Sequence, residues 1–229
     1  MTSSTRIFWA TVVALVIFNV ARGLGVFGSF ADPVELILAL ALTACALRCA
    51  LTKADLGLER SQVASGLRWG GAAFALVLMV VVVTSVIPAT SGFLHDSRGD
   101  IPLWRLILDL LWIALLTVIP EELLFRGVLL GAAMKKWGIV TGVVSTSVLF
   151  GFWHIFPTLS TAEGNEKFSQ ADSTTLGRLG LVAGAVVTTT IAGLIFCWLR
   201  VRSRSLVAPM VAHLATNGIA LTVAWFVVR

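Results

Sequence analysis

The chain has 229 residues, of which 58% are hydrophobic and only 13% are charged. Soluble domains average about 25% charged residues, so a soluble globular protein is excluded. The net charge of +5 comes largely from lysines and arginines in short loops between apolar runs, which indicates a membrane protein rather than a nucleic-acid-binding one.

Seven apolar runs are long enough to cross a bilayer, which takes about 20 largely apolar residues in a helix. In chain order they cover roughly residues 7–27, 34–51, 68–88, 103–134, 138–157, 179–200 and 205–228. The fourth run is longer than one crossing needs and contains Pro120, which predicts a tilted or kinked helix. The expected fold is therefore all-α, a polytopic transmembrane helical bundle of about seven helices.

The loop charges predict an orientation for this bundle. Ten lysines and arginines lie in loops on the N-terminal side, and five lie on the other side. Because cytoplasmic loops carry an excess of these residues, we expect the N-terminus inside and the C-terminus outside, in a multi-pass protein of the cell membrane. Two regions are expected: residues 1–102, an N-terminal three-helix membrane region, and residues 103–229, which carry the groups suited to chemistry.

Ionisable side chains inside the expected spans are few, and each costs ~2.5–3.5 kcal/mol at the bilayer centre. The main candidates are Glu121, Glu122 and Arg126 in the fourth run, His154 in the fifth, and His213 with the amide Asn217 in the seventh. Glu122 and Arg126 are four residues apart with the acid first, which favours an ion pair. Glu121 points about 100° away and has no local partner, so it is free to accept a proton as a general base.

The histidines complete a reaction centre. Phe150 and His154 share a helical face, and Gly151 allows another backbone to come close. His213 and Asn217 are again four residues apart, so an imidazole and a carboxamide direct hydrogen-bond donors at one point, as an oxyanion requires. A base, an imidazole and an oxyanion pair would suffice for water-mediated amide hydrolysis.

These motifs also occur in the order typical of a known family. The stretch "EELLFRG" resembles the EExxxR motif of the CPBP family (CAAX protease and bacteriocin-processing, or Abi) of intramembrane proteases. "FGFWH" is similar to the family's FxxxH motif and "HLATN" to its HxxxN motif, and the resemblance covers roughly residues 103–225. It implies an all-helical membrane bundle that hydrolyses peptide bonds inside the bilayer. CAAX-processing members remove the three residues after a prenylated cysteine.

The resemblance also implies a role for each motif residue. Glu121 would activate the water with help from His154. His213 and Asn217 would stabilise the tetrahedral oxyanion, while Glu122 and Arg126 would hold the geometry. The substrate would be a peptide or protein at the membrane; membrane lipids are the other expected partner, nucleic acid is not, and the oligomeric state is left open.

Three alternatives remain at this point. The favoured mechanism is metal-free and needs no cofactor, but Glu121, His154 and His213 could instead bind Zn²⁺ with an open fourth position. A non-enzymatic membrane protein that binds partners, for instance in bacteriocin immunity, could keep the same scaffold. A proton-coupled transporter would use the same three residues as a relay, although transporters usually show internal repeats and none is visible here.

The depth of the motifs sets a condition on the protease interpretation. At ~1.5 Å per residue, Glu121 and His154 lie about 22–24 Å from the inner ends of their spans, whereas His213 lies about 14 Å from its own. The three motifs meet only if the seventh span is tilted or is preceded by a deep loop.

Overall fold

The protein, seen here in a computed structural model, is described for residues 2–87, 99–161 and 174–227, and all of its regular elements there are helices. Seven helical segments in those ranges are long and apolar enough to cross a membrane, which confirms the predicted all-α bundle. The ends predicted for the third and seventh spans, at residues 88 and 228, lie outside the described residues.

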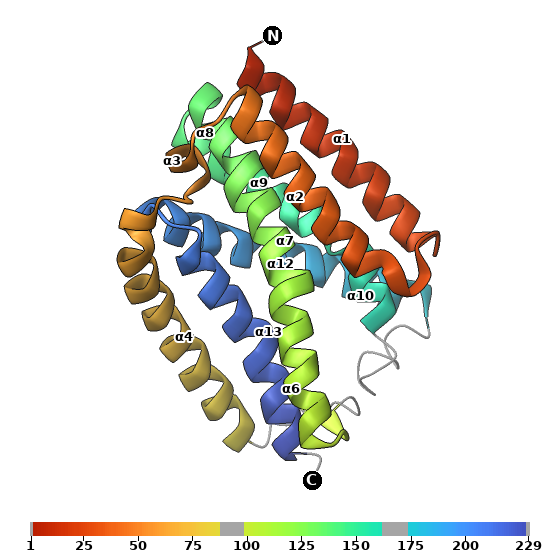
Figure 1. Cartoon of the computed structure of the whole chain (residues 1–229). Helices are drawn as coiled ribbons and strands as arrows, with labels where there is room; N and C mark the ends of the chain where they lie inside the picture. The colour runs from red at the N-terminus through yellow and green to blue at the C-terminus, as the bar shows by residue number, and fades with distance from the viewer. Residues whose placement is uncertain (1, 88–98, 162–173, 228–229) are drawn as a thin grey trace.

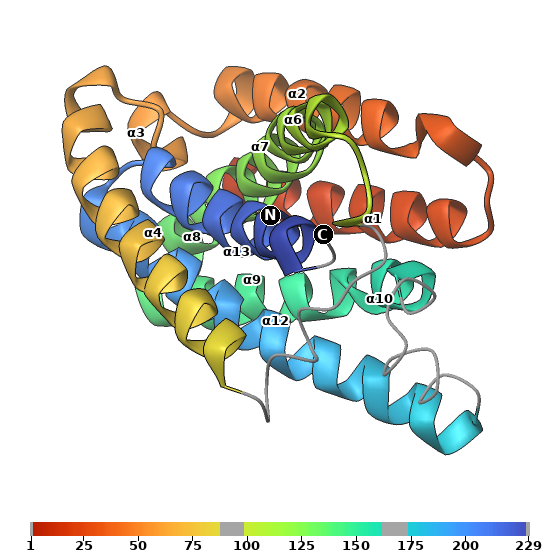
Figure 2. The same cartoon turned by 90° about the horizontal axis from the view of Figure 1, so that it is seen from below.

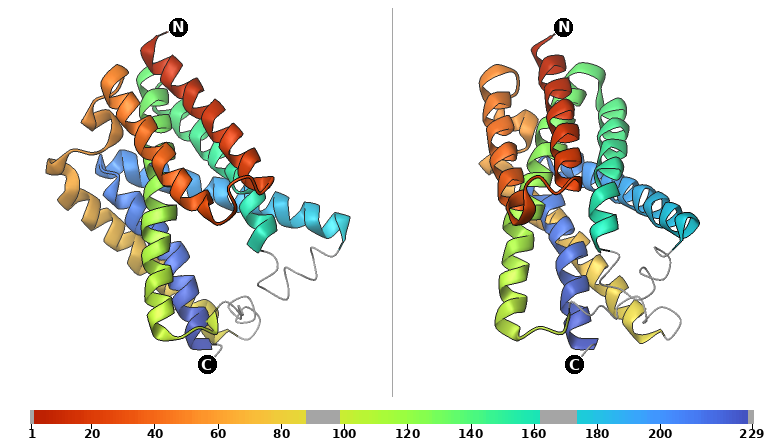
Figure 3. Two further views of the ribbon diagram at one scale, coloured as in Figure 1. Left: turned by 45° about the vertical axis from the view of Figure 1, so that its right-hand side comes forward. Right: turned by 90° about the vertical axis from the view of Figure 1, so that its right-hand side faces the viewer.

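The first three spans are α1 (Ser3–Gly23), α2 (Ala31–Cys49) and α4 (Val63–Val86). Three short helices join them: η1 (Gly28–Phe30) before α2, and α3 (Lys53–Leu56) and η2 (Arg60–Gln62) before α4. Helices α1 and α2 run beside each other as a hairpin, whereas α4 stands apart from them (Figures 1 and 3). The N-terminal spans therefore contact different parts of the bundle.

The fourth span is one continuous helix in which two π-helical segments interrupt the α-helix. It consists of α6 (Leu103–Trp112), the π-helical η5 (Ile113–Val118), α7 (Ile119–Glu122), the π-helical η6 (Leu123–Leu129) and α8 (Leu130–Trp137). Pro120 has no N–H to donate to the preceding turn and its ring crowds the carbonyl four residues back, so it disturbs the regular α-helical hydrogen bonds just before it. The irregularity predicted near Pro120 takes the form of wider π-helical turns, which often occur at functional sites.

The last spans are α9 (Ile139–Trp153) with its continuation α10 (Ile155–Thr161), α12 (Thr175–Ser203) and α13 (Val207–Val227). Helix α9 packs closely along α12, and α13 packs along α4. A Cβ added to Gly151 would lie 2.7 Å from the carbonyl oxygen of Val186, so the close approach predicted at Gly151 is confirmed. Figure 1 shows α1 beginning at one end of the molecule and α13 ending at the other, as an odd number of crossings requires. Which end faces the cytoplasm stays a prediction.

The seventh span begins inside the protein rather than at its edge. Ser203, Ser205 and Leu206, which connect α12 to α13, are each 1% exposed. The backbone N–H of Leu206 donates to the carbonyl of Gly57 at 2.9 Å, which ties this connection to the turn after α3. The connection is therefore partly buried in protein, and whether it lies deep in the membrane stays a prediction.

The fourth span forms the centre of the bundle. Every residue from Pro120 to Ala133 is buried. Helices α1, α2, α9 and α12 pack against η6, and α13 packs against α7. Seen from below in Figure 2, this span runs between the α1–α2 pair and α13. The two glutamates of α7 are thus enclosed by protein rather than by lipid.

Candidate active site

The ion pair predicted between Glu122 and Arg126 is confirmed. Arg126 Nη1 lies 3.0 Å from Glu122 Oε1, and the side chains are 1% and 0% exposed. The guanidinium carbon also lies 3.9 Å from the centre of the Phe150 ring and 5.0 Å from that of Phe196, so Arg126 makes cation–π interactions with both rings. This pairing leaves neither charge isolated in the interior.

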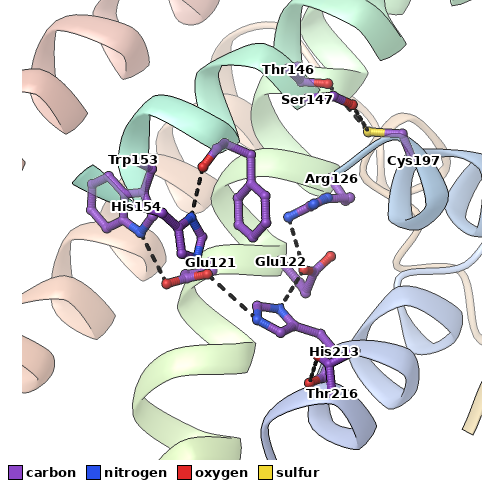
Figure 4. A network of polar contacts seen from close by, with 11 residues as sticks. Glu121, Glu122, Arg126, Thr146, Ser147, Trp153, His154, Cys197, His213 and Thr216 are labelled. Atoms are coloured by element: carbon purple, nitrogen blue, oxygen red, sulfur yellow. Dashed lines mark hydrogen bonds and ion pairs between the residues drawn. The ribbon is translucent and has the colours of Figure 1, made fainter. Parts of the chain in front are cut away.

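His213 connects the third motif to the first. Its Nδ1 lies 2.8 Å from Glu122 Oε1 and its Nε2 lies 3.8 Å from Glu121 Oε2, so the ring stands between the two carboxylates (Figure 4). The ring also stacks on Phe196 with centroids 5.1 Å apart. Sequence reasoning expected His213 to present a donor to the substrate, whereas the structure shows that Nδ1 already has a partner.

Glu121 is held by a residue that sequence reasoning missed. The indole Nε1 of Trp153 donates to Glu121 Oε1 at 3.0 Å. A buried tryptophan N–H usually finds an acceptor. Because Trp153 directly precedes His154, its position in the sequence could have indicated that it hydrogen-bonds within the site. The other oxygen, Oε2, has no hydrogen-bond partner among the described residues, although Glu121 is only 5% exposed. One carboxylate oxygen is therefore fixed, whereas the other is buried without a hydrogen bond, 3.8 Å from His213 Nε2.

His154 caps the C-terminal end of α9, beside Trp153. Its Nδ1 lies 2.8 Å from the carbonyl oxygen of Phe150, so Nδ1 carries the hydrogen and donates it. In that tautomer Nε2 keeps a lone pair. In Figure 4 Glu121 lies between His154 and His213. All three motifs therefore meet around Glu121.

Asn217 is not joined to this cluster. It lies half-buried on α13, one turn after His213, and its side chain makes no hydrogen bond within residues 2–87, 99–161 and 174–227. Its carboxamide is therefore available to a bound molecule.

Other polar residues of the first two spans support the site from outside. Asn19 Nδ2 donates to the carbonyl of Trp153 at 3.2 Å. Arg22 lies 2.8 Å from Asp32 and 2.9 Å from Glu35, and Glu35 is only 1% exposed. Sequence reasoning did not single out Glu35, because its partner lies on another helix rather than one turn away.

The favoured metal-free mechanism and the zinc alternative both stay predictions. Across the described ranges, no three His, Cys, Asp or Glu side chains are grouped closely enough to hold one metal ion. The steps proposed below follow the metal-free mechanism and use protein groups and water.

The comparison with protein families shows which family the chain belongs to. A family model described as type II CAAX prenyl endopeptidase Rce1-like matches residues 103–219, about half of the chain. The chain belongs to this family. Comparisons with curated proteins and with solved structures gave no match. The Rce1-like region contains all three motifs, and the CAAX-protease family suspected from the sequence is confirmed.

This family is one of proteases, and seven membrane-spanning segments make the chain an integral membrane protein. The first three spans of this Rce1-like protein lie outside the matched region. They nevertheless contribute Asn19, which contacts the backbone of Trp153. The first span therefore supports the site from outside the matched region.

Proposed function

We propose that this protein is an intramembrane endopeptidase of the cell membrane that hydrolyses a peptide bond in a prenylated, CAAX-type substrate. One observation carries the proposal: Glu121 is buried and fixed through Oε1 by Trp153, while its Oε2 has no protein donor. A carboxylate placed in this way can hold and deprotonate a water molecule.

In the first step, Glu121 Oε2 and the lone pair of His154 Nε2 orient a water molecule. Glu121 accepts a proton as the water oxygen bonds to the scissile carbonyl carbon. The tetrahedral intermediate then collapses, the C–N bond breaks, and the proton held by Glu121 passes to the leaving amine. The glutamate is returned to its starting form without any cofactor.

The developing oxyanion needs donors that are already in place. We assign this role to the carboxamide of Asn217, whose side chain has no other partner among the described residues, and to Nε2 of His213 when that nitrogen carries a hydrogen. Removing one donor of this kind typically costs about 10²–10³ in kcat.

Glu122 and Arg126 act through their neighbours rather than on the substrate. Glu122 Oε1 accepts from both Arg126 and His213, which fixes the ring that faces Glu121. Because the motif residues gather around one point and do not extend along a path, their placement supports a protease over a proton relay.

The test is cleavage of a fluorogenic prenylated CAAX peptide by the purified protein in detergent. Glu121→Gln keeps the shape of the side chain but removes the base, so kcat/KM should fall about 10²–10⁴-fold. The control is Glu59→Gln, at an exposed position just before η2, which should leave cleavage unchanged. Full activity in Glu121→Gln would overturn the mechanism. Absence of cleavage in the wild-type protein would favour the non-enzymatic alternative.

A further inference from the structure

Near the turn between α1 and α2, these two helices carry four polar side chains, which we call the polar strip: Asn19, Arg22, Asp32 and Glu35. Asn19 and Arg22 are three residues apart on α1, so they share one helical face. Asp32 and Glu35 have the same spacing on α2. Arg22 joins the two helices, since its guanidinium lies 2.8 Å from Asp32 and 2.9 Å from Glu35. Asn19 and Glu35 each lie one turn, about 4.5 Å, further from the end of the hairpin than Arg22 and Asp32.

One end of the polar strip opens into a cavity of about 520 Å³. Arg22 and Asp32 line this cavity together with Ser29 of η1 and Phe156 of α10. The side chains of Arg22 and Asp32 are 30% and 27% exposed. Because α1 ends and α2 begins here, the cavity lies at a boundary of the membrane, where water is available.

The other end of the polar strip reaches the general base. Glu35 is 1% exposed and close enough to Glu121 for the two carboxylate charges to repel each other, and α2 packs against α7. Asn19 is linked to the same base through Trp153. Its Nδ2 donates to the carbonyl of Trp153, whose indole N–H donates to Glu121. Asn19 and Glu35 therefore connect the cavity with Glu121.

Three buried oxygen atoms along this connection have no hydrogen-bond partner among the described residues: Asn19 Oδ1, Glu35 Oε1 and Glu121 Oε2. Carbonyl and ionised carboxylate oxygens are acceptors only, so they cannot satisfy one another. A buried acceptor without a donor is unfavourable. A water molecule supplies two donors and makes about three hydrogen bonds in a protein interior, which matches what these oxygens need.

We propose that Asn19 and Glu35 hold a row of water molecules that leads from the cavity to Glu121 and supplies the water that hydrolysis consumes. This inference rests on the proposed function and assigns the route of one of its two substrates. A site enclosed by protein between membrane-spanning helices must receive one water molecule for each peptide bond that it breaks. Asn19 and Glu35 are positioning residues here, because they bind the water row and do not touch the peptide bond.

The first test detects the water itself. A brief X-ray pulse turns bound water into hydroxyl radicals, which oxidise the side chains beside it, and mass spectrometry locates the products. Trp153 should be oxidised far more than Phe8, although both are 4% exposed. Glu35→Leu should lower the oxidation of Trp153 about tenfold, the effect of losing a hydrogen bond to a charged group. Glu35→Gln stays polar and should keep most of it.

The matched control is Thr43→Val. Thr43 also lies on α2 with a buried hydroxyl that has no partner among the described residues, but eight residues further from the cavity than Glu35. This variant should leave the oxidation of Trp153 unchanged. When the wild type is mixed with H₂¹⁸O before the pulse, the oxygen added to Trp153 should carry the heavy isotope, because the row opens into the cavity.

Cleavage by the same variants tests the supply of water. Glu35→Leu should lower kcat about tenfold with KM within about twofold, whereas Thr43→Val should change neither. Equal oxidation of Trp153 in these two variants, or no uptake of the heavy isotope, would overturn the water row. Reduced oxidation with an unchanged kcat would overturn its role in hydrolysis. Oxidation is measured without substrate, so a wild-type protein that fails to cleave would refute the proposed function while oxidation still decides the water row.

Discussion

Removing the charge of Arg126 should destabilise the protein strongly. Arg126 and Glu122 are 1% and 0% exposed and lie 3.0 Å apart. Breaking such a pair by removing one partner leaves an uncompensated buried charge and typically costs about 3–5 kcal/mol. Met at this position keeps much of the packing against Phe150, so we expect Arg126→Met to cost an amount in this range.

A double-mutant cycle separates the interaction energy of the Glu122–Arg126 pair from the cost of lost packing. Glu122→Gln removes the other charge and should cost a similar amount alone. In the double variant neither charge remains, so its cost should be smaller than the sum of the single costs by up to about 3 kcal/mol. The difference reports the interaction between the two side chains.

The assay is equilibrium unfolding in mixed detergent micelles, followed by circular dichroism and supported by melting temperatures. At about 2–4 °C per kcal/mol for a chain of this size, Arg126→Met should lower the Tm by roughly 6–20 °C. Arg105→Met is the control, because its pair with Asp109 is on the surface, with Arg105 55% exposed, and should cost no more than about 1 kcal/mol. A Tm for Arg126→Met close to that of Arg105→Met, or strictly additive costs in the cycle, would refute this reasoning.

Three further predictions concern the site and its packing. Trp153→Phe removes the donor to Glu121 but keeps an aromatic ring, so kcat should fall about tenfold or more, and an unchanged kcat would show that this hydrogen bond does not matter. Gly151→Ala should lower the Tm by several degrees because the new Cβ meets the backbone of α12, whereas Gly71→Ala, with open space around it, should not; equal Tm values would contradict the close packing. A strong zinc chelator should leave the cleavage rate unchanged; loss of cleavage that added Zn²⁺ restores would move the mechanism to a metal.

The number of spans could be predicted because each crossing needs an apolar run of similar length. The boundaries were less accurate: the third and sixth spans begin at Val63 and Thr175, earlier than the apolar runs suggested, because both helices continue through the serine, glycine and arginine residues that interrupt those runs. The π-helical turns around Glu121 could not be foreseen in detail. In a span that is apolar on every side, the sequence carries no periodicity that distinguishes π-helical from α-helical winding.

For the site, contacts within one helix could be predicted from the sequence, whereas contacts between helices could not. The i,i+4 spacing predicted the contact between Glu122 and Arg126. The contacts of Trp153 with Glu121 and of Arg22 with Glu35 join different helices, so no spacing along the chain reveals them. His213 was expected to donate to the substrate; its Nδ1 contacts Glu122 on another helix, which leaves only Nε2 for that role.

The pairing of Arg22 with Asp32 and Glu35 has a consequence for the order in which the protein assembles. Arg22 pairs with both acids within the first hairpin, α1–α2, which a ribosome completes long before the fourth span. Glu122 likewise meets Arg126 within its own span. Glu121 has no such local partner, and its neighbours Trp153 and His213 arrive with the fifth and seventh spans. The Glu121 carboxylate therefore gains its full surroundings only when the last helix is in place, so an incompletely synthesised chain lacks the complete site.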